Sequence, residues 1–211
     1  MPRPRTNHDE KRAIIVDAAT RTFARYGYEG TTNKLIAQAI QESGGASFTP
    51  ALIYHYFPEG KLQLFTMVMQ QYRPLQTLGQ QIQDNLHEPP EVFLRTIAHA
   101  YTTAFRTPHA AQLIQIVFTE GARQPEVSAQ FIGRVGPLIL VPLMTYLAKE
   151  SMLGRLRPIH PLSFAFEFFG PMLARIFILQ TFGPVVPVLL PSDDEFIECH
   201  VRTILNGLAV P

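Results

Sequence analysis

Residues 23–61 read FARYGYEGTTNKLIAQAIQESGGASFTPALIYHYFPEGK, and this stretch decides the fold. It contains two helix starts, because Thr32 precedes a segment of helical apolar spacing and Thr49 stands directly before a proline. Between them, Gly44-Gly45 interrupts the helical pattern. The order of helix, turn and short helix predicts a helix-turn-helix, whose second helix can enter the major groove of DNA.

The short helix has an inner and an outer side that the residue spacing separates. Ile53 and Phe57 are four positions apart, so they face the same way and are expected to pack in a small core. We expect Tyr56 to pack rather than to contact DNA. The side chains expected towards solvent or DNA are Pro50, Ala51, Tyr54 and His55.

The remainder of the chain also predicts helices, with no convincing strand alternation. An amphipathic helix begins near Thr6 and stops at Gly27, and a long one begins near residue 59, with a kink expected at Pro74. Further helices are expected at about 91–106, 109–120, 126–150, 161–182 and 192–207. The predicted fold class is therefore all-α, with about nine helices. The last helix opens on Ser192-Asp-Asp-Glu195, which has the spacing of a capping box.

Composition limits the class of protein. Hydrophobic residues make up 46% of the chain and charged residues 17%, which excludes a disordered chain and predicts apolar surface in a core, a cavity or a subunit contact. The net charge is only +1, with a small basic excess in residues 1–61 that is sharpest at Arg3 and Arg5.

Targeting signals and cysteine content favour the cytoplasm. The single cysteine, Cys199, excludes an internal disulfide framework and a multi-cysteine zinc site, and it fits a reducing compartment. The N-terminal residues lack the apolar segment of a signal peptide. The most apolar stretch, 162–190, is interrupted by Glu167 and Arg175, which favours a buried helix over a membrane span.

No catalytic or metal-binding constellation is evident. Cys199 and His200 are neighbours on a helix and point about 100° apart, so they cannot form a nucleophile–base pair. His99, His109 and His160 lack metal-ligand spacing. The sequence therefore predicts no enzyme, no metal site and no cofactor.

The residues around the motif resemble the TetR (tetracycline-repressor-like) family. The anchors that carry the likeness are Phe23-ARY-Gly27-Tyr28-EG-Thr31-Thr32, Ile36-Ala37, Ile53-Tyr54-His55-Tyr56-Phe57 and Pro58-Glu59-Gly60-Lys61. The likeness covers residues 7–65, whereas the rest of the chain is similar only in being helical. It implies a homodimeric, ligand-responsive transcription regulator, usually a repressor, that binds a palindromic operator.

The same resemblance assigns roles within the motif. Thr32 and Lys61 are implied phosphate contacts at helix starts, where free N–H groups and the helix dipole favour anions. Tyr54 is an implied phosphate or sugar contact, and Thr49 caps a helix whose first residues approach the bases. The whole expected DNA-binding set is Thr32, Lys34, Thr49, Pro50, Ala51, Tyr54, His55 and Lys61.

The chain departs from the family pattern in the turn, which is longer than usual. We expect the second helix to continue through Ile40 and Gln41, Ser43–Ser47 to form a looser turn, and Phe48 to fill the space between the two helices. Leu52 replaces a small hydroxyl residue, and it either meets a thymine methyl group or packs in the core.

The resemblance also implies a division near residue 60. Residues 1–60 are expected to bind DNA, with 1–6 as a flexible basic arm, and 61–211 to bind a ligand and dimerise. Aromatic and methionine side chains in the second part can be explained as core packing, but as a set they suggest a pocket for an apolar or aromatic ligand. The candidate ligand-binding residues are Met69, Tyr72, Tyr101, Phe105, Phe118, Phe169 and Met172.

Dimerisation has a candidate surface in the helices at 161–182 and 192–207. The first is apolar nearly all round, which in a soluble protein requires burial on both sides. Two such helices from each protomer form a four-helix interface, and two-fold symmetry places the recognition helices about one turn of DNA apart.

Two alternatives stay open at this point. An all-α ligand-binding protein or enzyme with a vestigial helix-turn-helix is compatible with the enlarged turn and the modest basic charge. The Arg3/Arg5 arm either reaches DNA or is a solvated tail. The effector, the operator and the choice between repressor and activator are likewise open.

Overall fold

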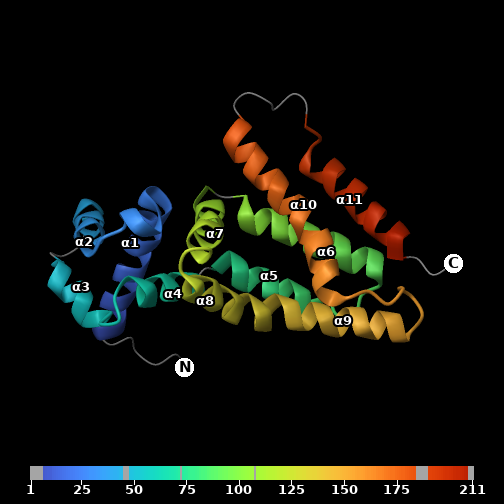
Figure 1. Ribbon diagram of the computed structural model, residues 1–211, viewed down its shortest axis with the longest axis horizontal. Coiled ribbons are helices and arrows are strands. Elements are labelled where there is room, and N and C mark those ends of the chain that lie inside the picture. The colour runs from blue at the N-terminus through green and yellow to red at the C-terminus, as the bar shows by residue number, and fades with distance from the viewer. Residues whose placement is uncertain (1–6, 45–47, 72, 107, 184–189, 209–211) are drawn as a thin grey trace. The chain divides into compact units, whose positions relative to one another are not determined.

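The computed structural model describes residues 7–44, 48–71, 73–106, 108–183 and 190–208, and all regular structure within them is helical (Figure 1). The all-α prediction is confirmed. The chain divides into two compact units. The first unit consists of Met1–Tyr72 with Gln112–Ile132, and the second consists of Arg73–Ala111 with Gly133–Pro211. The division predicted near residue 60 separates residues that bind DNA from residues that bind a ligand and dimerise. It is a division of function rather than of compact units, and it stays a prediction.

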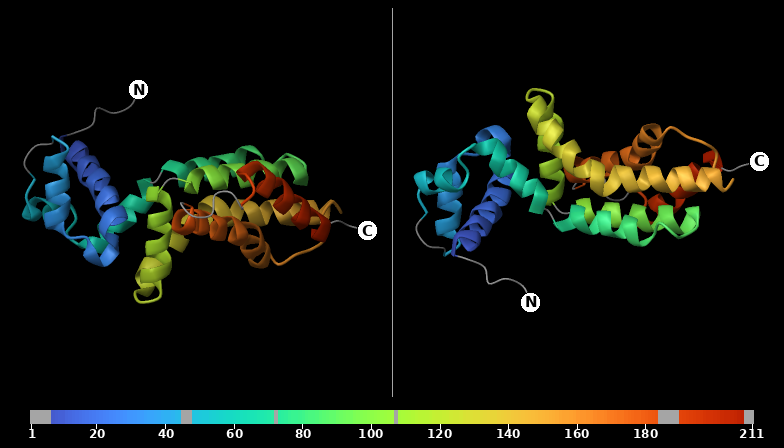
Figure 2. Two further views of the ribbon diagram at one scale, coloured as in Figure 1. Left: turned by 90° about the horizontal axis from the view of Figure 1, so that it is seen from above. Right: turned by 90° about the horizontal axis from the view of Figure 1, so that it is seen from below.

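Four consecutive helices begin the first unit. They are α1 (Asn7–Gly30), α2 (Asn33–Glu42), α3 (Pro50–Tyr56) and α4 (Lys61–Gln71). Both views of Figure 2 show these blue to teal helices packed beside one another. Most of α7 (Pro108–Gly121) and α8 (Pro125–Val135) also belong to this unit, and apolar side chains of α7 share one core with those of α1 and α4.

Three aromatic rings form the centre of this core. Phe23 stacks on Tyr28 with ring centroids 5.8 Å apart, and Phe65 meets the two rings edge-on at 5.3 and 5.5 Å. Phe23 and Phe65 are fully buried. Since edge-to-face pairs add to the energy of burial, this cluster is a strong link between α1 and α4.

Gly27 produces a bend in α1, where the sequence predicts a stop. Its φ of 71° and ψ of −178° lie in a region that is essentially restricted to glycine, and the helix continues after it to Gly30. The Thr31 hydroxyl donates to the Gly27 carbonyl at 2.7 Å and closes the turn that leads to α2.

Substitution of Gly27 tests how much the backbone conformation at this position contributes to stability. Gly27→Ala is expected to lower the free energy of unfolding by about 1–3 kcal/mol, because a Cβ is disfavoured at this φ and ψ. The added Cβ meets no atom within 4 Å, so a steric clash with neighbours does not contribute. Gly133→Ala, at an equally open helical position, is the control and should be neutral or stabilising by up to about 1 kcal/mol. Thermal unfolding followed by circular dichroism measures both, and equal effects would contradict the prediction.

The second unit is a bundle around α6 (Pro90–Phe105). It contains α5 (Arg73–Asp84), α9 (Val141–Met152), α10 (Pro161–Phe182) and α11 (Asp193–Leu208). Helix α6 packs against α5, α10 and α11, as the ribbon diagram shows (Figure 1). Buried Phe93 of α6 stacks on Tyr146 of α9 with ring centroids 3.7 Å apart, so the core of this unit is also aromatic.

A π-helical turn interrupts the regular α-helical pattern of one segment that the sequence predicts as a single long helix. The segment 126–150 contains a π-helical turn, η1 (Gly136–Leu140), between α8 and α9. Pro142 has no amide N–H to donate to Leu138, and a π turn is one way in which a helix accommodates such a loss. The helix expected from residue 59 is described as α4 and α5, and Pro74 stands in the first turn of α5.

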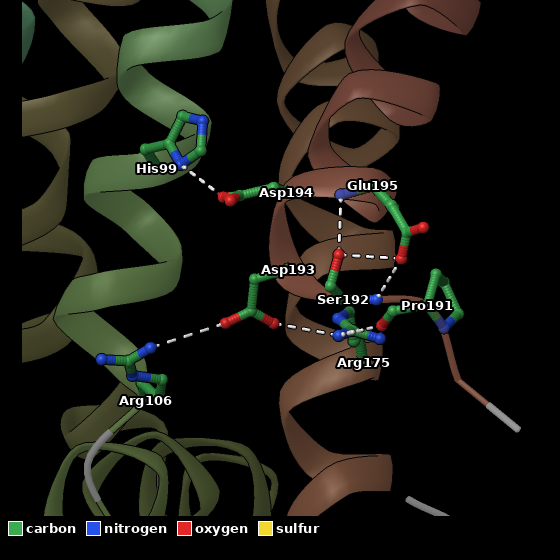
Figure 3. Close-up of polar contacts among 8 residues, drawn as sticks. All are labelled: His99, Arg106, Arg175, Pro191, Ser192, Asp193, Asp194 and Glu195. Atoms are coloured by element: carbon green, nitrogen blue, oxygen red, sulfur yellow. Dashed lines mark hydrogen bonds and ion pairs between the residues drawn. The ribbon is translucent and has the colours of Figure 1, made fainter. Parts of the chain in front are cut away.

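The predicted capping box at the start of α11 is confirmed (Figure 3). The Ser192 hydroxyl accepts from the Glu195 N–H at 3.2 Å, and Glu195 Oε2 accepts from the Ser192 N–H and hydroxyl, each at 2.8 Å. These hydrogen bonds lower the pKa of the Glu195 carboxyl. The helix start is therefore closed by local contacts.

Arg175, the cation that interrupts apolar α10, has its partners at the same place (Figure 3). Its guanidinium donates to Asp193 at 2.9 Å and to the Pro191 carbonyl at 2.7 Å, and Arg106, directly after α6, lies 3.7 Å from Asp193. Two helical stretches, Pro125–Met152 and Pro161–Phe182, are long and apolar enough to cross a membrane by length and composition alone. In the second of these, however, the Arg175 side chain is only 11% exposed and is paired within the bundle.

Candidate nucleic-acid interface

Threonine caps set the starts of both helices of the motif. The Thr32 hydroxyl accepts from the Leu35 N–H at 3.3 Å, and the Thr49 hydroxyl accepts from the Leu52 N–H at 3.2 Å. Pro50 occupies the first turn of α3, where its missing N–H costs nothing. The predicted starts of α2 and α3 are therefore confirmed.

The inner side of α3 is buried as the spacing predicts. Ile53 and Phe57 are essentially inaccessible, and Tyr56 is 8% exposed. All three join the core of the first unit, and Leu52 is half-buried against it. The opposite side of α3 is left free for another molecule.

The enlarged turn is a local change that leaves both helices in place. Helix α2 continues through Ile40 to Glu42, and Phe48 is buried in the core, as expected. Arg21 of α1 donates to the Ser43 hydroxyl at 3.2 Å, which ties the beginning of the turn to α1. Residues 45–47 of the predicted looser turn lie outside the described residues.

Arg12 is a positioning residue that sequence reasoning did not single out. Its guanidinium donates to the Tyr56 carbonyl at 3.4 Å and lies over the Phe57 ring, 4.8 Å from the centroid. It therefore caps the end of α3 from α1. Only a positive charge near the N-terminus marks this residue in the sequence, and that signal is too weak to identify a contact across 44 positions.

All eight predicted DNA-binding residues are accessible. Tyr54 is the large apolar side chain of the set and is 58% exposed. Lys61 is half-buried, and the exposed members are Thr32, Lys34, Thr49, Pro50, Ala51, Tyr54 and His55. Their contact with DNA stays a prediction, and the exposed side of α3 is free of buried core residues.

Lys61 begins α4 and is held by a residue that the sequence did not indicate. Its ammonium lies 3.6 Å from Glu29 Oε2 and 4.4 Å from the centroid of the Tyr28 ring. Gln124 donates to the other Glu29 oxygen at 2.9 Å. Glu29 therefore positions Lys61 at the helix start, and its carboxylate pairs with the charge that the predicted phosphate contact needs.

The predicted ligand-binding residues fall into separate groups. Tyr101, Phe105 and Phe169 form a cluster in the second unit, with ring centroids 4.7 and 4.9 Å from that of Tyr101. Met172, also in this unit, is buried. Burial raises the pKa of the Tyr101 phenol above its ordinary value.

The other three predicted ligand residues lie elsewhere. Met69 is buried in the core of the first unit, and Phe118 of α7 is 61% exposed. Tyr72 lies outside the described residues. The structure thus brings together Tyr101 and Phe105 of α6 with Phe169 of α10.

Comparison with known proteins identifies the family. The family model of the AefR-like transcriptional repressor C-terminal domain matches residues 93–207, more than half of the chain, and that of the bacterial regulatory proteins of the tetR family matches residues 15–68. The chain belongs to the TetR family. It is a DNA-binding, ligand-responsive transcription regulator of a family whose members act as dimers and are generally soluble regulators rather than enzymes.

Similar proteins cover nearly the whole of this TetR-family chain. The HTH-type transcriptional regulator YhgD of Bacillus subtilis (strain 168) is 24% identical over 189 residues, which are 89% of this chain and 91% of YhgD. A TetR-family regulator from Mesorhizobium loti MAFF303099 shares the fold with a TM-score of 0.71 at 19% identity, covering 98% of this chain and 100% of that one. AibR in complex with isovaleryl coenzyme A and operator DNA has a TM-score of 0.62 at 22% identity, with coverages of 95% and 99%.

Proposed function

We propose that this TetR-family regulator is a cytoplasmic repressor without enzymatic activity that is released from a palindromic operator by a small apolar or aromatic ligand. The observation that carries the proposal is the intact recognition helix. Helix α3 keeps its Thr49 cap and its buried anchors, while Pro50, Ala51, Tyr54 and His55 are exposed. An enlarged turn before the cap does not remove any of these features.

The DNA contacts divide into positioning and reading groups. Thr32, Lys34, Tyr54 and Lys61 are proposed to contact the sugar–phosphate backbone, where helix starts and cations favour anions. Residues 50, 51 and 55 of α3 are proposed to meet base edges in the major groove. In this assignment residues 1–60 bind DNA and residues 61–211 bind the effector and dimerise.

The effector site is proposed at the aromatic cluster of α6 and α10. Tyr101, Phe105, Phe169 and Met172 offer apolar surface, and the neutral Tyr101 hydroxyl offers a single polar contact. AibR, which has a related fold, is solved with both isovaleryl coenzyme A and operator DNA. This supports the proposal that one chain of this fold binds both a ligand and DNA. Filling the site is proposed to shift α4, which starts at Lys61, and so to change the spacing of the recognition helices.

The dimer is proposed to form through α10 and α11. Helix α10 exposes large apolar side chains, although the protein belongs to a family of soluble regulators. These residues are Leu162, Phe166, Ile178 and Phe182. A four-helix interface with a second copy covers such a surface and aligns two recognition helices by two-fold symmetry.

A gel-shift experiment with the DNA that flanks its own gene tests the proposal. Tyr54→Ala is expected to weaken specific retardation by about 10- to 100-fold, because it removes a direct contact at an exposed site. Tyr26→Ala, at another exposed tyrosine on α1, should leave the affinity within about two-fold and is the matched control.

Two outcomes of this assay oppose the proposal. Absence of specific retardation even at low salt favours an all-α ligand-binding protein or enzyme instead. Equal losses in the two tyrosine variants would mean that Tyr54 of α3 makes no specific contact with the DNA. An effector that dissociates the complex must also bind more weakly to the DNA-bound protein by the same factor, which calorimetry can measure.

A further inference from the structure

A cavity in the second unit, the α6–α11 cavity, lies between the start of α6, the C-terminal half of α11 and the connection from α9 to α10. Its volume is about 660 Å³, which is enough for a small organic molecule. Five charged side chains line it, namely Arg95, Arg155, Arg202, Glu91 and Glu198. None of them belongs to the predicted DNA-binding or ligand-binding sets, so the cavity has no role in the proposed function.

Ion pairs show how α6 and α11 are aligned along this cavity. Arg106, directly after α6, pairs with Asp193 at the start of α11, whereas Arg95, near the start of α6, pairs with Glu198 further along α11. The two helices therefore run antiparallel. This arrangement places the beginning of α6 beside residues 202–206, in the last turns of α11.

The two glutamates of the lining share one arginine. Arg95 Nη2 lies 3.0 Å from Glu91 Oε1, and Arg95 Nε lies 3.0 Å from Glu198 Oε1. Both negative charges of the lining are thus paired within it. They do not form ion pairs with the other two arginines.

Arg155 is held in place by a carboxylate that does not line the cavity. Its Nε and Nη2 atoms donate to the two oxygens of Glu150 at 2.5 and 2.8 Å, and Glu150 is fully buried. This bidentate contact uses two of the five N–H groups of a guanidinium. The Arg155 side chain is nevertheless 47% exposed. An anion can therefore meet it at a low cost in side-chain entropy, because its orientation is already fixed.

Arg202 is the charge that stays uncompensated in the lining. Its side chain is exposed, and among the described residues no carboxylate forms an ion pair with it. Three arginines and two glutamates give the lining a formal charge of 3 − 2 = +1. Because Arg95 pairs with both glutamates, the excess positive charge lies at Arg202, and it favours an anion.

Apolar side chains beside these arginines favour an organic anion over an inorganic one. Pro89 is exposed, and Pro90 and Leu205 are half-buried, so all three offer surface to a ligand. An inorganic anion would leave this surface in water, whereas a hydrocarbon group covers it. The lining therefore fits a molecule with one negative charge and a short apolar part.

We propose that the α6–α11 cavity binds a small organic carboxylate, whose oxygens accept hydrogen bonds from Arg155 and Arg202. Its hydrocarbon part contacts Pro89, Pro90 and Leu205. A carboxylate is the anion that matches the planar, forked donors of a guanidinium. This site is separate from the DNA contacts and from the aromatic cluster proposed to bind the effector.

Sodium pentanoate is the probe, and n-pentanol, of similar length, is its uncharged control. Amide chemical shifts of the full-length protein are followed by NMR at neutral pH and constant ionic strength, with sodium chloride as the blank. We expect saturable shifts at the start of α6, at residues 155–156 and in the last turns of α11. Binding of n-pentanol should be about tenfold weaker, because it lacks the charge-assisted hydrogen bonds.

Substitution of the unpaired arginine completes the test. Arg202→Gln should weaken pentanoate binding by about tenfold and change n-pentanol binding by less than about two-fold. Arg134→Gln, at an exposed arginine of α8, is the matched control and should leave both affinities within about two-fold. Arg155 is kept intact, because its removal would leave the buried Glu150 without its bidentate partner.

Three results would each overturn the proposal. They are equal binding of the two probes, an unchanged pentanoate affinity in Arg202→Gln, and shifts confined to residues around Tyr101 and Phe169. The last result would place the probe at the proposed effector site instead, so it would support the proposed function while removing this inference.

Discussion

Phe65→Ala is expected to lower the free energy of unfolding by about 3–5 kcal/mol, the range for deleting a buried phenylalanine ring from a core. Phe65 is fully buried and meets both Phe23 and Tyr28 edge-on. Its removal leaves a cavity where α4 packs on α1. The variant therefore loses both the free energy gained by burying the ring and the contacts between the aromatic rings. The motif depends on this packing, because α4 carries Lys61, the proposed phosphate contact, at its start.

Urea denaturation followed by circular dichroism measures this effect. Phe118→Ala is the matched control, because the Phe118 ring is 61% exposed and its loss should cost less than about 0.5 kcal/mol. A loss below about 1 kcal/mol for Phe65→Ala would show that the site collapses without a cavity. It would also mean that the aromatic cluster is not what holds α4 in place.

Lys61 and Glu29 are expected to have opposite effects on operator affinity. Lys61→Ala should weaken binding by about tenfold or more, because it removes the proposed phosphate contact at the start of α4 from each protomer. Glu29→Gln should instead strengthen binding by a factor of about two to ten. That substitution removes a carboxylate that lies 3.6 Å from the Lys61 ammonium and that repels phosphate.

The dependence of operator affinity on salt distinguishes a phosphate contact from a purely structural role. For a dimer, Lys61→Ala should reduce the slope of log affinity against log salt by about two, one unit for each lost contact. Glu59→Gln, at an exposed carboxylate in the same turn, is the control for removing a negative charge. An unchanged slope for Lys61→Ala would mean that this lysine stabilises the fold through Tyr28 and Glu29 without touching DNA.

The features predicted correctly from the sequence are those governed by neighbours along the chain. Thr32 and Thr49 cap helices through N–H groups three residues away, and Ser192 with Glu195 does the same for α11. The burial of Ile53 and Phe57 follows from one helical turn. Each depends on contacts within a single turn, so residue type and spacing suffice to predict it.

The features that were missed join residues far apart in the chain. Gln124 reaches Glu29 across 95 positions, and Arg12 reaches Tyr56 across 44. Nothing in local spacing distinguishes such polar residues from others on a solvated surface. The π turn at 136–140 was also missed, because Pro137 and Pro142 indicate a disturbed helix but not the form that the disturbance takes.

The sequence by itself therefore determined the helical class, the two capped helices of the motif, the exposed side of α3 and the resemblance to the TetR family. Only the tertiary structure decided which charges meet, as with Glu29 and Lys61, which predicted ligand residues share a cluster, and that Arg155 and Arg202 line one cavity. The physical reason is that caps and periodicity arise from hydrogen bonds within one turn. Burial and ion pairing instead depend on side chains that folding brings together from distant segments.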